Sequence, residues 1–137
     1  MYIIIAGCSK VGAILVKKLS EEGHDVAVID RDPERFEQLG SGCNCMTIAG
    51  VPIDEDVLRE AGIEKADALA AVTDDDNTNI MVAQIARQLY RVPKVLLETD
   101  DPERQRVLTI MGMHIICPTT LTVESFFSEM QKEERVK

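Results

Sequence analysis

Six short apolar runs alternate with segments of helical spacing, and this alternation limits the fold of the chain more than any other feature of its sequence. Runs rich in Val, Ile and Ala are typical of strands buried on both faces of a parallel sheet. The expected strands are 2–6, 26–29 (ending at Asp30), 45–49, 67–73, 94–98 and 114–117. Strands that alternate with helices are parallel and are joined by right-handed crossovers. The sequence therefore predicts an α/β fold with a doubly wound, six-stranded parallel sheet flanked by helices.

Helix start signals lie between these strands. Asp32-Pro33-Glu34 and Asp101-Pro102-Glu103 each combine an N-cap residue, a Pro at the first helical position and an acid after it. The other expected helices begin near Val11, span 54–61 and 76–90, and begin again at Thr122. The expected inward-facing residues of the helix 76–90 are Ile80, Ala83, Ile85, Ala86 and Leu89. We expect a single Rossmann-like domain over 1–130 and a charged C-terminal tail over 131–137.

Composition excludes several classes of protein. The chain has 137 residues, the size of one ordinary domain, and its 15 basic and 24 acidic residues give a formal net charge of −9. This charge argues against general nucleic-acid binding, which requires a basic surface. No apolar run approaches the length of about 18 residues that a membrane span needs. The first residues form neither a charged leader nor a cleavage-site pattern, so we expect no export signal and a cytoplasmic protein.

The four cysteines, Cys8, Cys43, Cys45 and Cys117, are scattered along the chain. In a reducing cytoplasm they are expected to remain thiols. Cys43 and Cys45 are spaced more closely than the cysteine pairs of zinc sites, and the two histidines stand alone in sequence. We therefore predict free thiols and no metal site.

A glycine-rich motif, Gly7-Cys8-Ser9-Lys10-Val11-Gly12, lies between the first strand and the first helix. It matches the dinucleotide-binding pattern G-x-G-x-x-G except that Ser9 replaces the middle glycine. Gly7 permits a tight turn, and Gly12 allows the helix to pack close to the sheet. The N–H groups at the helix start suit a phosphate. Asp30, at the end of the second strand, is placed to accept hydrogen bonds from both ribose hydroxyls. The order strand, turn, helix, strand and acid predicts a nucleotide site.

Ser9 has two interpretations. Its Cβ crowds the position where a pyrophosphate normally contacts bare backbone, which weakens a dinucleotide. Alternatively, its hydroxyl donates a hydrogen bond to the phosphate and Lys10 adds positive charge. A nucleotide fold with an empty site is a further alternative.

Other polar residues and the last helix give weaker indications of function. Thr73 and Asp74 follow the fourth strand, beside the switch point where ligands bind in doubly wound folds. The acidic run 74–76 is better explained by capping of the next helix than by a cation. Phe126 and Phe127 on the last helix need a surface to cover, and a partner subunit is a reasonable one. No catalytic triad, carboxylate pair or Tyr-x-x-x-Lys pattern stands out, so binding without catalysis is the simpler conclusion.

The segments 1–7, 21–26, 28–33, 58–68 and 71–79 carry a resemblance that extends from residue 1 to about 130. The chain resembles the nucleotide-binding N-terminal domain of the TrkA- and KtrA-type potassium-transport regulators, also called the RCK or KTN domain. The resemblance implies a non-enzymatic cytoplasmic subunit at the inner face of the membrane. It also implies binding of NAD(H) or an adenine nucleotide (AMP, ADP or ATP), and a homodimer or ring that gates a separate potassium-translocating membrane subunit.

On matching positions, the resemblance implies that the loop from Gly7 to Gly12 (Cys8, Ser9, Lys10 and Val11 included) holds phosphate and that Asp30 holds the ribose. Arg31 would flank the adenine, and Thr73 and Asp74 would close over the nucleotide. Gly50 remains from the family's Gly-Asp pair and is counted among the expected contacts. The chain differs from the family pattern at Ser9, Val51, Glu98 and Thr119. These differences favour a small adenine nucleotide over NAD or a metal-bridged ATP.

Two functions follow from these observations. The first is a regulatory nucleotide-binding subunit of a potassium channel or transporter, working alone or with a separate ligand-sensing polypeptide of the C-terminal RCK type. The second is an NAD-dependent oxidoreductase with an unrecognised substrate site.

Overall fold

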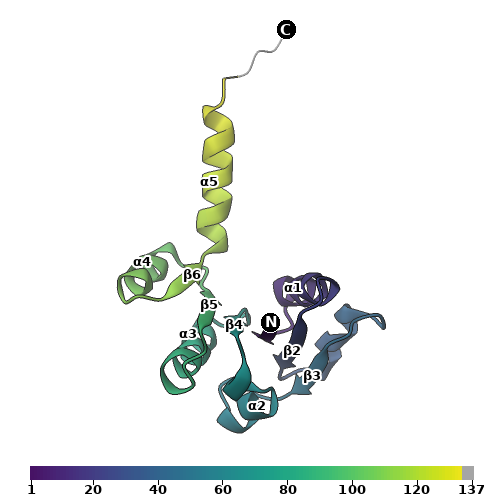
Figure 1. The fold of residues 1–137 in the computed structure, drawn as a ribbon. Coiled ribbons are helices and arrows are strands. Elements are labelled where there is room, and N and C mark those ends of the chain that lie inside the picture. The colour runs from purple at the N-terminus through teal and green to yellow at the C-terminus, as the bar shows by residue number, and fades with distance from the viewer. Residues whose placement is uncertain (134–137) are drawn as a thin grey trace.

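A computed structural model describes residues 1–133, and its strands form one parallel sheet in the order β3-β2-β1-β4-β5-β6 (Figure 1). The strands are β1 (Tyr2–Ala6), β2 (Asp25–Asp30), β3 (Met46–Ala49), β4 (Ala68–Ala71), β5 (Lys94–Glu98) and β6 (His114–Ile116). β1 pairs with β2 on one side and with β4 on the other, so the strand order reverses direction between β1 and β4. The predicted six-stranded, Rossmann-like parallel sheet is confirmed.

Helices connect the strands on both faces of the sheet. They are α1 (Lys10–Glu21), η1 (Pro33–Leu39, a 3₁₀ helix), α2 (Glu55–Glu60), η2 (Ile63–Lys65, 3₁₀), α3 (Asp76–Gln84), η3 (Ile85–Leu89, a π-helix), α4 (Pro102–Ile110) and α5 (Pro118–Gln131). The predicted N-caps Asp32 and Asp101 accept hydrogen bonds from the backbone N–H groups of Glu34 and Glu103.

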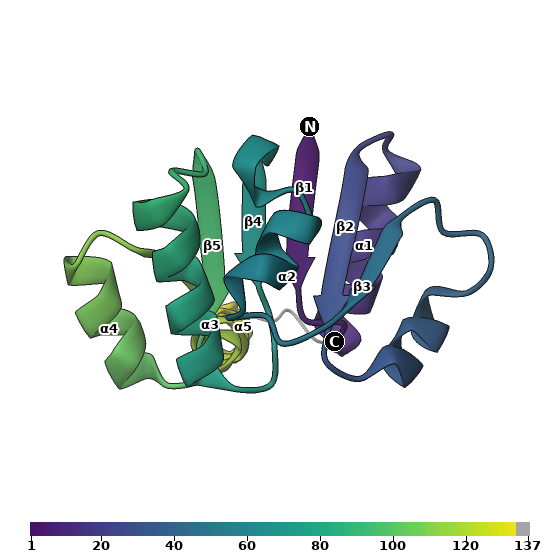
Figure 2. The ribbon, with the colours of Figure 1, turned by 90° about the horizontal axis from the view of Figure 1, so that it is seen from below.

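Two apolar clusters hold the helices against the sheet. The cluster on the α1 side includes Ile5, Val16 and Val28, which are fully buried. The cluster on the other side includes Leu69 and Val82 and packs α2, α3 and α4 onto the sheet. Figure 2 shows α1 behind the sheet and α2 and α3 in front of it. This arrangement brings the carboxyl ends of all six strands to one edge.

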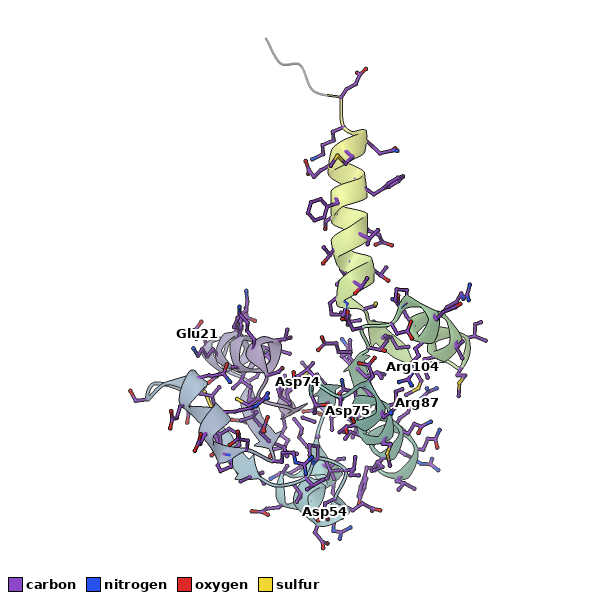
Figure 3. All side chains as sticks on the ribbon, turned by 180° about the vertical axis from the view of Figure 1, so that it is seen from behind. Glu21, Asp54, Asp74, Asp75, Arg87 and Arg104 are labelled. Atoms are coloured by element: carbon purple, nitrogen blue, oxygen red, sulfur yellow. A yellow bond between two sulfur atoms is a disulfide. The ribbon has the colours of Figure 1, made fainter. Side chains whose placement is uncertain are left out.

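α5 follows β6 and projects away from the sheet (Figure 1). None of its residues is buried, and Phe126 and Phe127 are each 63% exposed. Figure 3 shows that the side chains of α5 beyond its first turn extend from the helix without reaching the sheet. Within residues 1–133, no helix covers the α1 side of the sheet over β5 and β6.

Several boundaries differ from the sequence-based expectations. β4 ends at Ala71 rather than at residue 73, and α5 begins at Pro118 rather than at Thr122. The expected helix 76–90 ends in the π-helix η3, where wider i→i+5 hydrogen bonding turns the buried face. For this reason Leu89, expected to face inward, is 63% exposed, whereas Val82 is buried.

The prediction of free thiols is wrong for two of the four cysteines. Cys43 and Cys45 form a disulfide in the segment that joins η1 to β3, with their Cα atoms 5.5 Å apart. This Cα separation is within the range that a disulfide spans, although the spacing of the two cysteines along the chain did not reveal the bond. Cys8 and Cys117 are free and buried.

The predicted charged C-terminal tail begins where α5 ends. Gln131 ends α5, and residues 134–137 of the predicted charged tail lie outside the described residues. Among the described residues, no helix has the length and apolar character needed to cross a membrane.

Candidate functional site

The glycine-rich loop turns sharply between β1 and α1. Gly7 has φ +115°, and a Cβ there would lie 2.7 Å from the backbone nitrogen of Thr73. A Cβ on Gly12 would lie 2.0 Å from the carbonyl oxygen of Gly7, so α1 packs directly on the loop. Both glycines therefore have the conformational roles expected from the motif: a tight turn and close packing of the helix.

Ser9, in the place of the middle glycine, is the N-cap of α1. Its hydroxyl accepts a hydrogen bond from the Gly12 N–H (3.1 Å) and donates one to the Val72 carbonyl (2.7 Å). The side chain is buried, and its single proton is directed at the end of β4 rather than outward to a ligand. Ser9 thus connects the loop to β4, a role that neither sequence interpretation included.

Asp30 ends β2 with a carboxylate that is held in place by the backbone. The Cys8 N–H donates to Oδ2 and the Asp32 N–H donates to Oδ1, each at 2.8 Å. The residue is only 7% exposed. Because a carboxylate offers about four lone pairs, each oxygen can still accept a further hydrogen bond from a ligand. The acid is therefore oriented before any ligand arrives.

The Cys8 side chain turns away from any ligand. It is fully buried in the α1-side cluster, and its thiol donates to the carbonyl oxygen of Arg35 at 3.4 Å. Burial, followed by the negative charge of Asp30, raises the pKa of the Cys8 thiol. Only the backbone of Cys8 faces the site.

A cavity of about 430 Å³ lies at the carboxyl ends of β2, β3 and β4. Its lining residues are Asp30, Arg31, Asp32, Arg35, Val51, Pro52, Ile53, Thr73, Asp74, Asp75 and Thr78. The cavity brings together four of the predicted site residues: Asp30, Arg31, Thr73 and Asp74. Its volume falls within the usual range of small-molecule sites.

The other predicted residues lie outside this lining. The loop Gly7–Gly12 adjoins the cavity through the bond from Cys8 to Asp30, but its own residues do not line it. The side chains of Lys10 and Val11 are exposed on the first turn of α1. Gly50 packs against Val57, and its N–H donates to the carbonyl oxygen of Asp30.

Sequence reasoning missed several lining residues. Val51, Pro52 and Ile53 supply an apolar wall, and the sequence singled out only Val51, as a difference from the family pattern and not as a contact. Arg35 lies on η1, one turn beyond its N-cap Asp32, so its helical position was the available signal. Its guanidinium forms an ion pair with Asp74 at 2.9 Å, and this bond raises the pKa of Arg35.

The loop between β4 and α3 is held by hydrogen bonds of its own. Asp75 caps α3 by accepting from the N–H and hydroxyl of Thr78, which lowers the pKa of Asp75. Asn79 is fully buried and bonds to Thr73 and to the Glu98 carbonyl. Figure 3 labels Asp74 and Asp75 beside the start of α3. The capping interpretation of this acidic run is thus confirmed at Asp75.

Acidic residues also gather at the end of β5. Burial, together with the charges of Asp100, Asp76 and Asp74, raises the pKa of Glu98. Within residues 1–133, no group of three His, Cys, Asp or Glu residues lies close enough together to hold a metal ion. A second cavity of about 280 Å³ near the amino ends of β5 and β6 contains none of the predicted site residues.

Comparison with known proteins identifies relatives of this arrangement. A model of the TrkA-N domain family matches residues 3–118. The Trk system potassium uptake protein TrkA of Streptomyces coelicolor is 46% identical over 123 residues, which cover 90% of this chain and 53% of that protein. The chain thus spans about half the length of this curated relative.

Solved structures share the fold at lower sequence identity. The TrkA-N domain of the Escherichia coli inner membrane protein YbaL has a TM-score of 0.83 and 16% identity, with 96% of each chain covered. The Shewanella denitrificans Kef CTD in AMP-bound form has a TM-score of 0.79 and 17% identity over 97% of this chain and 84% of that one. The GsuK channel bound to NAD has a TM-score of 0.70 and 21% identity over 85% of this chain and 21% of that one. On the family match and the identity to TrkA, the chain belongs to the TrkA-N domain family.

Proposed function

We propose that this chain is a nucleotide-binding regulatory subunit that gates a separate potassium-transporting membrane protein. The observation that carries the proposal is the buried Asp30 carboxylate, fixed by the Cys8 N–H of the glycine-rich loop at the wall of the 430 Å³ cavity. A fixed acid beside such a loop is the arrangement that binds a ribose and its phosphates in this fold.

The ligand that this site favours is a small adenine nucleotide, AMP or ADP, ahead of ATP or NAD(H). Asp30 would accept hydrogen bonds from the ribose hydroxyls, and the N–H groups at the start of α1 would face the phosphate. Arg31 would lie beside the adenine, and Thr73 would lie across the cavity from it. The solved relatives are consistent with this class, because the Kef CTD is described with AMP and GsuK with NAD or ADP.

The partner that we propose is a potassium-translocating membrane subunit, since the Streptomyces relative is named as part of the Trk potassium uptake system. The chain would then act in the cytoplasm at the inner face of the membrane. A separate ligand-sensing polypeptide of the C-terminal RCK type is a second partner that we propose.

Assembly into a homodimer or ring accounts for α5. Phe126 and Phe127 are exposed on a helix that covers none of its own sheet, and within residues 1–133 the α1 side of β5 and β6 is uncovered. Apolar surface of this kind is typical of an interface. The last helix of one subunit would therefore contact another copy of the chain.

The first experiment is mass spectrometry of nucleotide released from freshly purified protein, with a thermal-shift panel of AMP, ADP, ATP, NAD and NADH. A ligand at 100 times its dissociation constant stabilises the folded state by about 2.7 kcal/mol. Asp30→Ala should weaken binding by roughly 2–3 kcal/mol, because it removes charge-assisted hydrogen bonds. Asp25→Ala, at the other end of β2, is the matched control and should bind normally.

The regulatory role needs a second test, a potassium flux assay with the cognate membrane subunit. Deletion of the chain should change potassium uptake and remove its dependence on nucleotide. Uptake that stays the same would contradict the proposal. Steady hydride transfer from NADH to a carbonyl compound would instead favour the oxidoreductase alternative.

A further inference from the structure

One ion pair joins the two walls of the nucleotide cavity. The Arg35 guanidinium extends from η1 and meets the Asp74 carboxylate, which follows β4, at 2.9 Å. Both residues line the cavity, and their side chains are 40% and 68% exposed. The pair therefore links η1 to the loop after β4 across the cavity, although these segments are far apart in sequence.

The fold does not depend on this pair. Exposed ion pairs contribute little to stability, because water and salt screen them. The backbone of Arg35 is held independently: its carbonyl oxygen accepts from the Cys8 thiol and from Gln38 Nε2, and Gln38 Nε2 also donates to the Cys8 carbonyl oxygen. η1 is thus attached to the glycine-rich loop whether or not the pair forms, and only the guanidinium is free to exchange partners.

The negative charge of the cavity lining means that a ligand phosphate would need the positive charge of the Arg35 guanidinium. Four acids (Asp30, Asp32, Asp74 and Asp75) and two arginines (Arg31 and Arg35) line it, so its side chains carry a net charge of −2. A phosphate adds further negative charge and needs a cation. An arginine is well suited, because its planar fork binds phosphate and carboxylate oxygens in the same geometry.

We propose that Arg35 recognises the phosphate of the bound nucleotide and that Asp74 is an internal competitor for it. On binding, a phosphate oxygen takes the position that the Asp74 carboxylate occupies on the guanidinium. The flanking residues need not move, since Thr73 is bonded to Asn79 and Asp75 caps α3. The inference rests on the proposed nucleotide function and adds to it a residue that discriminates nucleotides from nucleosides.

The test compares AMP with adenosine by titration calorimetry on the full chain and two variants. Arg35→Gln should weaken AMP binding by roughly tenfold to a hundredfold, as expected for loss of a charge-assisted hydrogen bond, and should leave adenosine nearly unchanged. Asp74→Asn should tighten AMP binding by up to about fivefold, as expected when an exposed ion pair no longer competes, again without affecting adenosine. The two halves of one ion pair thus give changes of opposite sign.

Controls separate this inference from simpler explanations. Arg106→Gln removes another exposed ion pair, with Glu103 on α4, and should leave both ligands unaffected. Arg35→Lys keeps the charge and should recover part of the AMP affinity. If Asp74→Asn weakens AMP, Asp74 is a direct ligand and the inference is wrong. If Arg35→Gln binds AMP normally, it is wrong while the proposed function stands. If neither ligand binds the unaltered chain, both fail.

Discussion

The two halves of the sheet differ in how completely they are covered. Along one row of paired residues, Val28 and Ile5 are fully buried under α1, whereas Ala70 and Leu96 are half-buried and His114 is exposed. The row continues through the same sheet on the same face, so only the covering layer changes. In the half formed by β1, β2 and β3 that layer is α1 and η1. In the half formed by β4, β5 and β6, the layer reaches Ala68 of β4 but is absent over β5 and β6 within residues 1–133.

This difference in covering separates ligand binding from assembly. The covered half holds the glycine-rich loop and Asp30, and Thr73 and Asp74 after β4 complete the cavity within one chain. The open half ends in α5, whose apolar side chains are exposed and cover no surface of residues 1–133. A mutation in the covered half should therefore act on folding and ligand binding, and a mutation in α5 should act on assembly.

The largest expected effect is in the covered half. Gly12→Ala places a Cβ 2.0 Å from the Gly7 carbonyl oxygen, in a contact between two backbones that cannot easily yield. We expect a loss of about 3 kcal/mol in the free energy of unfolding, measured by urea denaturation. Gly42→Ala is the matched control, because its Cβ would meet nothing within 4 Å. Equal stability of the two variants would show that α1 does not pack as described.

In the open half, the double substitution of Phe126 and Phe127 by Ser should act on assembly. Loss of two large aromatic anchors from an interface should weaken self-association by about 2 kcal/mol or more, roughly thirtyfold in the dissociation constant. Sedimentation velocity over a range of concentrations measures this. Ser125→Ala on the same helix should associate normally. An assembly that survives the double substitution would place the interface elsewhere.

The Cys43–Cys45 disulfide gives a smaller effect in the covered half. Closing so short a loop restricts the unfolded chain by about 1.5 kcal/mol at most in the chain-entropy account. Reduction should lower the free energy of unfolding by up to that amount, measured with and without dithiothreitol. A variant with Ser at both positions should not respond to the reductant. A response in that variant would assign the effect to other residues.

The smallest effect concerns Glu98 at the end of β5. Its pKa in the folded state is raised above the ordinary value of 4.5. At pH values between the unfolded-state pKa and the folded-state pKa, the folded state therefore binds more protons than the unfolded state. Stability therefore falls as the pH rises through this interval and stays lower above it. Glu98→Gln should be more stable than the unaltered chain at pH 7, by less than about 1 kcal/mol for this half-buried group, and equally stable near pH 4. Thermal unfolding at both pH values measures the difference, and a constant difference would contradict the assignment.

Local patterns predicted the sheet well, because each strand is a short apolar run and Asp32 and Asp101 mark their helices with a cap and a proline. The position of Asp30 at the cavity was predicted for the same reason, since it ends a strand at a fixed place in the motif. The roles of Arg35 and Ser9 were not predicted, because they depend on contacts with residues that are distant in sequence. Arg35 acquires its role from Asp74 on another segment, and the Ser9 hydroxyl from Val72. Leu89 was misplaced because no residue pattern announces a π-helix.

α5 begins at the same edge of the sheet as the cavity, so a change at this edge would also tilt the helix. Hydrogen bonds run from Thr99 and the Asp100 N–H to Asp76 at the start of α3, and from Thr119 to Asp100. These bonds therefore connect the first turn of α5 to the start of α3, whose N-cap Asp75 follows Asp74 in the sequence. Fourteen residues at 1.5 Å each give an arm of about 21 Å, so a tilt of about 10° at its base carries the tip through about 4 Å. A small tilt at the base of α5 would therefore produce its largest displacement at the far end of the helix, where we propose that a second subunit binds.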